Sequence, residues 1–143
     1  MPKNPPEGMQ RIIPYLTYAD APAAIGFLCQ AFGFEERFRY PMPDGRIGHA
    51  ELGYQDNVLM LASAYEGFGE SPLRLPAIHG QVYCFVDDVE AHCARARAAG
   101  AKIVTEPATK DYGSEWGIDR SYQAEDPEGH RWWFAQRMSN PKK

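Results

Sequence analysis

The chain repeats one pattern of apolar residues, and this repeat limits the folds that it can adopt. In the later copy, residues 81–86 alternate between apolar and mixed side chains, which is typical of a strand with one buried face. Asp87 and Asp88 can then cap a helix that ends at Gly100, and another strand is predicted over residues 102–105. The apolar stripe of this helix consists of Val89, Cys93 and Ala96.

The earlier copy follows the same order. Residues 13–18 form the predicted strand, Asp20 is the expected helix cap, Gly33 ends the helix, and residues 34–40 form the second strand. The stripe of this helix consists of Ala24, Ile25, Leu28 and Phe32. A repeat of this kind predicts two copies of one supersecondary unit.

Further strands complete each copy. In the first copy, a turn at residues 43–45 leads into a predicted strand at 46–53, and a turn at residues 55–57 leads into another at 58–63. This gives the order β-α-β-β-β. In the second, the turn at residues 126–129 separates predicted strands at 122–124 and 130–136. Residues 107–121 contain glycines, charges and aromatic residues, and we expect them to form a mobile rim around a cavity.

These elements predict an α+β fold built from two tandem βαβββ units. The chain has 143 residues, of which 44% are hydrophobic, and a chain of this length buries roughly two-thirds of its unfolded surface. We therefore expect a single domain. The predicted organisation is a flexible leader over residues 1–10, a domain over residues 11–136 with units 11–63 and 80–136 and a linker over 64–79, and a tail over residues 137–143.

Charge and composition exclude several classes of function. A net charge of -4 without any run of basic residues argues against a nucleic-acid partner. No apolar run approaches the ~20 residues that cross a bilayer, and the amino end lacks the apolar core of a signal peptide. The chain contains three cysteines and no Cys-x-x-Cys pair, which favours a reducing compartment. The expected location is the cytoplasm, without a membrane partner.

Alternation along the strands separates core positions from positions that face a cavity. Ala50 and Leu52 share one face of their strand, so His49 and Glu51 must lie on the other. The three aromatic residues 132–134 (WWF) also point alternately to the two faces of their strand. We predict that Trp133 faces the cavity, whereas Trp132 and Phe134 belong to the core.

The order of elements resembles the vicinal-oxygen-chelate superfamily of glyoxalases, bleomycin-resistance proteins and dioxygenases. The segments that carry the resemblance are residues 18–20, 31–34, 85–89, 98–101 and 126–130, while residues 47–52 and 112–113 are similar to the bleomycin-resistance-like subgroup. The resemblance implies a curled, eight-stranded mixed sheet that forms a cup, with the helices outside and the ligand inside. It also implies a homodimer, because family members often complete each cup with strands from two chains.

The resemblance also bears on metal binding. Metal enzymes of this superfamily draw one ligand each from the first and fourth strand of each unit, and the corresponding residues here are Ile13, Met60, Gln81 and Trp133. Only the Gln81 side chain offers a donor, and a divalent metal needs several carboxylate, imidazole or thiolate groups. We therefore expect no metal and no other cofactor.

The favoured function is that of a binding protein resembling bleomycin-resistance proteins, which holds an aromatic or glycopeptide-like small molecule without converting it. Aromatic side chains that line a concave surface can stack on such a ligand. No catalytic residue is identified. The predicted ligand-binding residues are Tyr15, His49, Glu51, Met60, Gln81, Tyr83, Phe85, Tyr112, Trp116, Arg120 and Trp133.

Two alternatives remain open. One is a metal-dependent lyase, isomerase or dioxygenase of the glyoxalase kind, with a displaced metal held by His49, Glu51 and a third residue that the sequence does not identify. The same two residues can also be an acid–base pair, but a solvated polar pair is the favoured interpretation. The other is a module whose cavity has closed and that assembles with another protein. Cysteines 29, 84 and 93 face the core in this interpretation, and histidines 79, 92 and 130 are expected in a loop, on a helix surface and in a turn.

Overall fold

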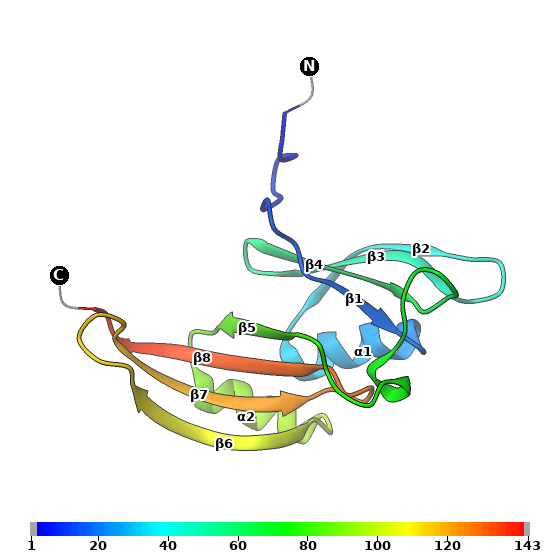
Figure 1. The fold of residues 1–143 in the computed structure, drawn as a ribbon. Helices are drawn as coiled ribbons and strands as arrows, with labels where there is room; N and C mark the ends of the chain where they lie inside the picture. Colours follow the sequence, from blue (N-terminus) through cyan, green and yellow to red (C-terminus); the bar gives the residue numbers. More distant parts are fainter. Residues whose placement is uncertain (1–2, 142–143) are drawn as a thin grey trace. The chain divides into compact units, whose positions relative to one another are not determined.

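A computed structural model describes residues 3–141, which divide into two compact units on either side of the bond between Pro76 and Ala77. Each unit contains one helix and one four-stranded mixed sheet (Figure 1). Both units have the order βαβββ, which confirms the predicted α+β class and the tandem repeat.

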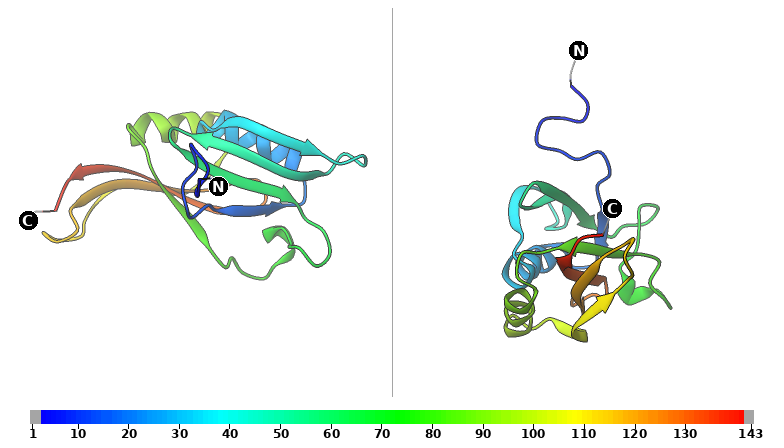
Figure 2. Two further views of the ribbon diagram at one scale, coloured as in Figure 1. Left: turned by 90° about the horizontal axis from the view of Figure 1, so that it is seen from above. Right: turned by 90° about the vertical axis from the view of Figure 1, so that its left-hand side faces the viewer.

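Unit 1 comprises the chain up to Pro76. Its sheet has the order β1-β4-β3-β2, in which β1 runs parallel to β4 and the other pairs are antiparallel. Helix α1 contacts all four strands and lies along one face of this sheet (Figure 2). The elements are β1 (Tyr15–Tyr18), α1 (Ala21–Phe32), β2 (Glu35–Pro41), β3 (Ile47–Tyr54) and β4 (Asn57–Ser63), followed by a 3-10 helix, η1 (Pro72–Arg74), in the predicted linker.

Unit 2 begins at Ala77 and repeats this topology. Its sheet has the order β5-β8-β7-β6, in which β5 runs parallel to β8 and the remaining pairs are antiparallel. Helix α2 contacts β6, β7 and β8. The elements are β5 (Gln81–Phe85), α2 (Val89–Ala98), β6 (Lys102–Asp111), β7 (Ile118–Glu125) and β8 (Arg131–Ser139).

Helix α1 begins and ends where the sequence predicts. The Asp20 carboxylate accepts a hydrogen bond from the Ala23 amide at 3.1 Å, and Pro22 occupies the first turn, where its missing N–H leaves no bond unmade. Gly33 ends the helix in the left-handed conformation at φ 83°. All four predicted stripe residues of α1 are buried.

Helix α2 departs from its prediction at one residue. Asp88 caps the helix by accepting from the Ala91 amide at 3.0 Å, as expected. His92, however, is only 9% exposed instead of lying on the helix surface. Its Nδ1 is hydrogen-bonded to Tyr122 Oη at 2.6 Å, and its ring centroid lies 4.3 Å from that of Phe134. The prediction was wrong because His92 falls on the same helical stripe as the buried residues of α2 and finds a polar partner on β7.

A single carboxylate organises the turn before β8. Asp126 accepts from the backbone amides of Glu128 and His130 and from Trp132 Nε1, each at 3.1 Å. The turn therefore holds the indole of Trp132 in the core, where both Trp132 and Phe134 are fully buried. Trp133 is partly exposed on the opposite face, so the predicted division of these aromatic residues is confirmed.

Residues 107–121, predicted to be an irregular rim, are mostly strand. Strand β6 continues to Asp111 and β7 already begins at Ile118, so most of this segment forms a long hairpin (Figure 1). The tip of the hairpin turns at Gly113 and Gly117, which both have positive φ. The strand register shifts next to Pro107, and this irregularity explains why the sequence of the segment did not show a clear strand pattern.

The boundaries of the domain also shift slightly. Strand β8 continues to Ser139, so residues 137–139 of the predicted tail belong to the sheet. At the other end, the side chain of Gln10 exchanges hydrogen bonds with the backbone of Val58 and ties the end of the leader to β4. Residues 1, 2, 142 and 143 of the predicted leader and tail lie outside the described part of the chain.

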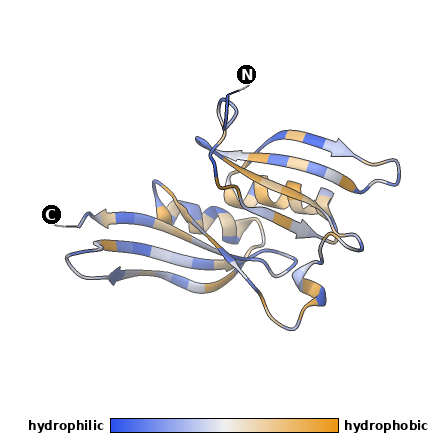
Figure 3. Cartoon of the chain, turned by 45° about the horizontal axis from the view of Figure 1, so that its top comes forward, coloured by the Kyte–Doolittle hydropathy of each residue, from blue (hydrophilic) through white to orange (hydrophobic). Residues whose placement is uncertain are grey.

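The two helices differ in character. In Figure 3, α1 is coloured almost entirely as hydrophobic or neutral, whereas α2 alternates with hydrophilic residues that include Glu90, Arg95 and Arg97. Among residues 3–141, no helix has both the length and the apolar content that crossing a membrane requires.

Candidate functional site

Each sheet has one face covered by its helix and one helix-free face that carries polar and aromatic side chains. In β3, Ala50 and Leu52 are fully buried beside α1, while His49 and Glu51 are partly exposed on the helix-free face. The predicted alternation of this strand is therefore correct. Met60 lies opposite both Glu51 and Tyr15 in the strand register.

Three side chains on this face of unit 1 form a hydrogen-bonded chain. Tyr15 Oη lies 2.8 Å from His49 Nδ1, and His49 Nε2 lies 3.3 Å from Glu51 Oε1. Burial, followed by the nearby Tyr65 and Glu51, raises the pKa of Tyr15, so its hydroxyl stays protonated at neutral pH. Both ring nitrogens of His49 are engaged within the protein.

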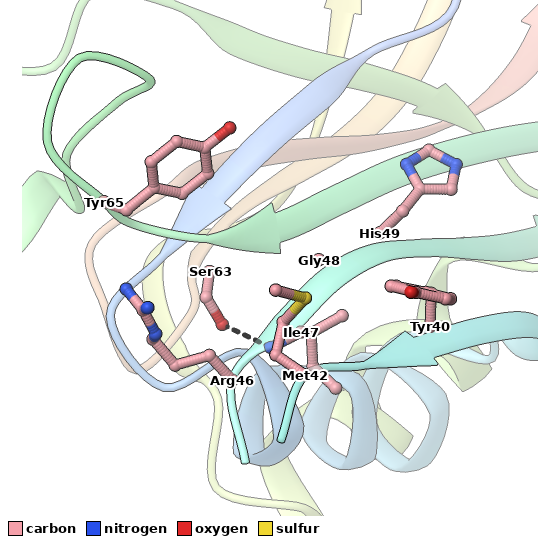
Figure 4. A pocket seen from close by; sticks show the side chains of 8 residues that line it. All are labelled: Tyr40, Met42, Arg46, Ile47, Gly48, His49, Ser63 and Tyr65. Atoms are coloured by element: carbon pink, nitrogen blue, oxygen red, sulfur yellow. Dashed lines mark hydrogen bonds between the residues drawn. The ribbon is translucent and has the colours of Figure 1, made fainter. Parts of the chain in front are cut away.

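A pocket of about 410 Å³ adjoins this chain of side chains (Figure 4). Ser63 Oγ accepts a hydrogen bond from the Ile47 amide at 2.8 Å at its base. Tyr65 stacks on Phe68 at a centroid distance of 4.7 Å, and Phe68 contacts Tyr15 in turn. The pocket is lined by Tyr40, Met42, Arg46, Ile47, Gly48, His49, Ser63 and Tyr65, of which the sequence had indicated only His49.

Unit 2 has a second pocket, of about 470 Å³. It brings together four of the predicted ligand-binding residues from two separate segments. Tyr83 and Phe85 lie on β5, whereas Tyr112 and Trp116 lie in the tip of the β6–β7 hairpin. It also includes Asp119 and Arg137, which the sequence did not indicate. The lining residues are Tyr83, Phe85, Tyr112, Trp116, Asp119 and Arg137.

The Asp119 carboxylate is the polar centre of this pocket. It is 4% exposed and accepts hydrogen bonds from Tyr83 Oη at 2.9 Å and from Arg137 Nε at 2.5 Å. The Arg137 guanidinium lies 5.5 Å from the ring centroid of Phe85. Burial, reinforced by the hydrogen bond to Asp119, raises the pKa of Tyr83, so Tyr83 acts as a donor and not as a base.

Amide side chains occupy the other end of the same face. Gln81 Oε1 accepts hydrogen bonds from Gln123 Nε2 at 2.8 Å and from Trp133 Nε1 at 3.0 Å. The ammonium of Lys110 lies 4.3 Å from the ring centroid of Trp133. Gln81 and Trp133 therefore form a small network apart from the residues that line the pocket.

Arg120 does not share the pocket with Tyr112, contrary to expectation. It alternates with Asp119 along β7 and forms an ion pair with Glu90 of α2, on the helix side of the sheet. It also donates to Thr109 Oγ1 at 3.2 Å. Since the rim turned out to be a strand, the alternation of β7 turns Arg120 away from the cavity.

Comparison with known proteins identifies the family. The model of the Glyoxalase/Bleomycin resistance protein/Dioxygenase superfamily matches residues 10–134. The chain belongs to this superfamily. An uncharacterized protein of Mycobacterium tuberculosis H37Rv is 33% identical over 127 residues, which cover 86% of this chain and 72% of that protein.

Solved structures agree with the superfamily fold. TioX from Micromonospora sp. ML1 is 31% identical with a TM-score of 0.69, over 89% of this chain and 98% of TioX. The fosfomycin resistance protein FosX from Listeria monocytogenes has a TM-score of 0.61 over 92% of this chain and 90% of its own, but only 12% identity, so the likeness shows the fold alone.

The residues present do not fit the metal that many members of the superfamily use. Within residues 3–141, no three His, Cys, Asp or Glu side chains converge in a group that could hold a metal ion. Among the four positions implied by the resemblance, only Gln81 has a donor oxygen, and this oxygen already accepts two hydrogen bonds. Ile13, Met60 and Trp133 supply no hard ligand.

Two of the three cysteines are poor nucleophiles. Burial raises the pKa of the Cys84 thiol to about 11 and also raises the pKa of Cys93. Cys29 is the third free cysteine and lies on α1. A thiol whose pKa is raised holds its proton at neutral pH and attacks poorly.

Proposed function

We propose that the chain is a small-molecule binding protein similar to bleomycin-resistance proteins, and that it holds an aromatic or glycopeptide-like compound without a metal. The observation that carries this proposal is the pocket of unit 2. There, aromatic side chains surround a buried carboxylate that is already hydrogen-bonded to Tyr83 and Arg137.

The walls of this pocket suit a flat ligand. Trp116 is 71% exposed, and Tyr112 and Phe85 are each about half exposed, so a ligand between them would remove a large apolar area from water. Aromatic stacking contributes roughly 0.5–1.5 kcal/mol for each pair beyond the area that it buries. We therefore expect this pocket to bind aromatic compounds more tightly than other compounds.

The polar groups of the pocket favour orientation of a ligand over chemical conversion. Arg137 contacts Asp119 through Nε, so its terminal nitrogens can donate to a carbonyl or carboxylate on the ligand. Asp119 balances the charge of Arg137, and Tyr83 keeps its proton. None of these three groups is poised as a base or a nucleophile, which supports binding without turnover.

The family supports the same class of function. Its description includes bleomycin-resistance proteins, and the FosX structures are described as fosfomycin resistance proteins. Both descriptions concern resistance to a small molecule. The class of compound proposed for this chain follows from its own pocket, which is aromatic and nearly neutral.

Screening for a ligand tests the proposal directly. A compound at 100 times its Kd should add about 2.7 kcal/mol to the stability of the protein, which a thermal-shift screen of bleomycin-type and flat aromatic compounds detects. We expect Trp116→Ala to abolish the shift and Tyr40→Ala, on the pocket of unit 1, to preserve it. If no compound in the panel raised the unfolding temperature, the result would count against binding. If a compound raised it equally in Trp116→Ala, the binding site would lie elsewhere.

The competing function is a glyoxalase-type enzyme with a displaced metal at His49 and Glu51. Each nitrogen of His49 already has a partner, Tyr15 on one side and Glu51 on the other, so this site fits a metal poorly. Metal analysis of the purified protein distinguishes the two functions. Stoichiometric metal that disappears in His49→Ala would favour the enzyme.

We also propose that the protein acts as a homodimer in the cytoplasm. The three free cysteines suit a reducing compartment, and the resemblance to a superfamily whose members often dimerise supports the dimer. Light scattering of the purified protein should give twice the mass of one chain. A monomeric mass at micromolar concentration would contradict the dimer.

A further inference from the structure

The indole of Trp133 presents one face to a positive charge. Its Nε1 donates to Gln81 Oε1 at 3.0 Å, and Gln81 is held in turn by Gln123, so the ring has a fixed orientation. The ammonium of Lys110 lies 4.3 Å from the ring centroid. A cation at this distance over a Trp face is attracted by the negative potential of the ring.

The strand register shows the path that Lys110 takes to reach this ring. Lys110 on β6 lies opposite Asp119 on β7, whereas Trp133 on β8 lies opposite Gln123. The side chain of Lys110 must therefore cross β7 diagonally, past Ser121, which lies between those two residues on the same face. Asp119, the carboxylate opposite Lys110, already accepts hydrogen bonds from Tyr83 and Arg137.

Ser121 is a buried hydroxyl that no group on this face satisfies. It is 1% exposed, and its Oγ has no hydrogen-bond partner within the described residues. The residues opposite it are Ala108 and Ala135, whose methyl groups cannot donate or accept. A buried hydroxyl without a partner is unfavourable, so a ligand group that bonds to Ser121 would remove this penalty.

These features together define a candidate binding site on unit 2, which we call the Ser121 site. Its base is Ala108, Ser121 and Ala135, one end is the face of Trp133, and the side chain of Lys110 lies across it. Among residues 3–141, Lys110 forms no ion pair. Its flexible side chain is held by the contact with Trp133 and can swing aside.

We propose that the Ser121 site binds an amino alcohol, whose ammonium replaces that of Lys110 over Trp133 and whose hydroxyl bonds to Ser121. Diagonal neighbours on adjacent strands lie about 7–8 Å apart, which sets the separation between the two groups of the ligand at a few carbon atoms. Lys110 occupies the site in the absence of a ligand and competes with the ligand for Trp133. The proposal uses none of the aromatic side chains that line the pocket of unit 2.

The test compares two probes that differ in one hydroxyl, 4-amino-1-butanol and butylamine. Each is titrated at constant ionic strength while the Trp133 Nε1–H resonance is followed by NMR. Lys110→Gln removes the competing cation and should tighten both probes about 2- to 5-fold, the effect expected of one exposed cation–π contact. Lys102→Gln, an exposed lysine on the same strand, should change neither.

Two further positions examine the contacts of the ligand. Ser121→Ala should weaken 4-amino-1-butanol to the affinity of butylamine and leave butylamine unchanged. Trp133→Leu should abolish the binding of both probes, and Trp133→Phe, which keeps a weaker aromatic face, should retain part of it. Because both substitutions of Trp133 remove the indole N–H reporter, binding to these variants is followed through the backbone amide of Ser121.

Several outcomes overturn the proposal. Unchanged affinities in Lys110→Gln would mean that Lys110 does not compete, and equal affinities of the two probes would remove the role of Ser121. Binding that survives in Trp133→Leu would place the amine elsewhere. Trp116→Ala should leave these titrations unchanged while it abolishes binding of aromatic compounds, so failure of one proposal is distinguished from failure of the other.

Discussion

Unit 1 and unit 2 place a tyrosine at the same point of the same topology but give its hydroxyl different partners. Tyr15 lies opposite Met60, and Tyr83 lies opposite Trp133, each on the strand that runs parallel to the last one of its unit. Tyr15 bonds to an imidazole, whereas Tyr83 donates to the buried carboxylate of Asp119. The topology sets the position of the phenol, and the residue on the neighbouring strands sets its chemistry.

The cores differ as well. Unit 1 packs α1 against aliphatic residues of its sheet, including Leu52 and Leu61. Unit 2 packs α2 against aromatic rings. The ring centroid of Phe134 lies 5.4 Å from that of Tyr122 and 6.0 Å from that of Trp132. Aromatic residues carry more buried area each, so unit 2 concentrates its stability in fewer side chains.

The largest expected effect is the loss of an aromatic core residue from unit 2. Trp132→Ala should reduce the free energy of unfolding by roughly 3–5 kcal/mol, because it opens a cavity and deprives Asp126 of one donor. Urea unfolding measures the change. The matched control is Trp133→Ala, on the helix-free face, where we expect about 1 kcal/mol or less. Equal losses in the two variants would contradict the difference between the faces.

The second effect concerns the thiol of β5. Burial raises the pKa of Cys84 to about 11, so at pH 8 only about one thiol in a thousand is ionised, against roughly a quarter of free cysteines. Alkylation of Cys84 by iodoacetamide should therefore be about 250-fold slower in the folded protein than in urea. Peptide mapping by mass spectrometry gives the rate. A similar rate in both states would show that this thiol is not buried.

The third effect separates the two tyrosine networks. Asp119→Ala removes a buried carboxylate, leaves Tyr83 and Arg137 without their acceptor and should cost about 1–3 kcal/mol. His49→Ala removes the corresponding partner of Tyr15 at a more exposed site and should cost less than about 1 kcal/mol. Both are measured by thermal unfolding. If His49→Ala proved the more damaging variant, the network of unit 1 would be the structural one.

The smallest effect is expected from the phenol of unit 1. Tyr15→Phe removes one partly exposed hydrogen bond and should change stability by about 0.5 kcal/mol or less. The matched variant Tyr83→Phe leaves a buried carboxylate with one donor fewer and should cost more. A double-mutant cycle of Tyr15→Phe with His49→Ala measures the coupling directly.

Local periodicity was sufficient to predict most of the fold. The alternation of Ala50 and Leu52 against His49 and Glu51 identified both faces of β3, because a strand buried on one side must alternate. Helix caps at Asp20 and Asp88 were equally direct, since each carboxylate bonds to an amide three residues along the chain.

The candidate site was harder to predict because its polar partners are distant in sequence. Asp119 meets Tyr83 from 36 residues away, and Pro107, Gly113 and Gly117 made its surroundings resemble a loop. The pattern of Asp119, Ser121 and Gln123 at every second position was the available signal for a longer β7. His92 was missed for the same reason, as its partner Tyr122 lies 30 residues further along the chain.

Pro107 has a consequence for how copies of this chain can associate. Strand β6 is the outermost strand of its sheet, and Pro107 interrupts the row of backbone N–H groups along it at a shift in register. A strand from another molecule cannot form a continuous ladder there, which protects the exposed hairpin from aggregation. An assembly of this protein that extends a sheet is therefore expected to use another edge strand than β6, such as β5 in the same sheet.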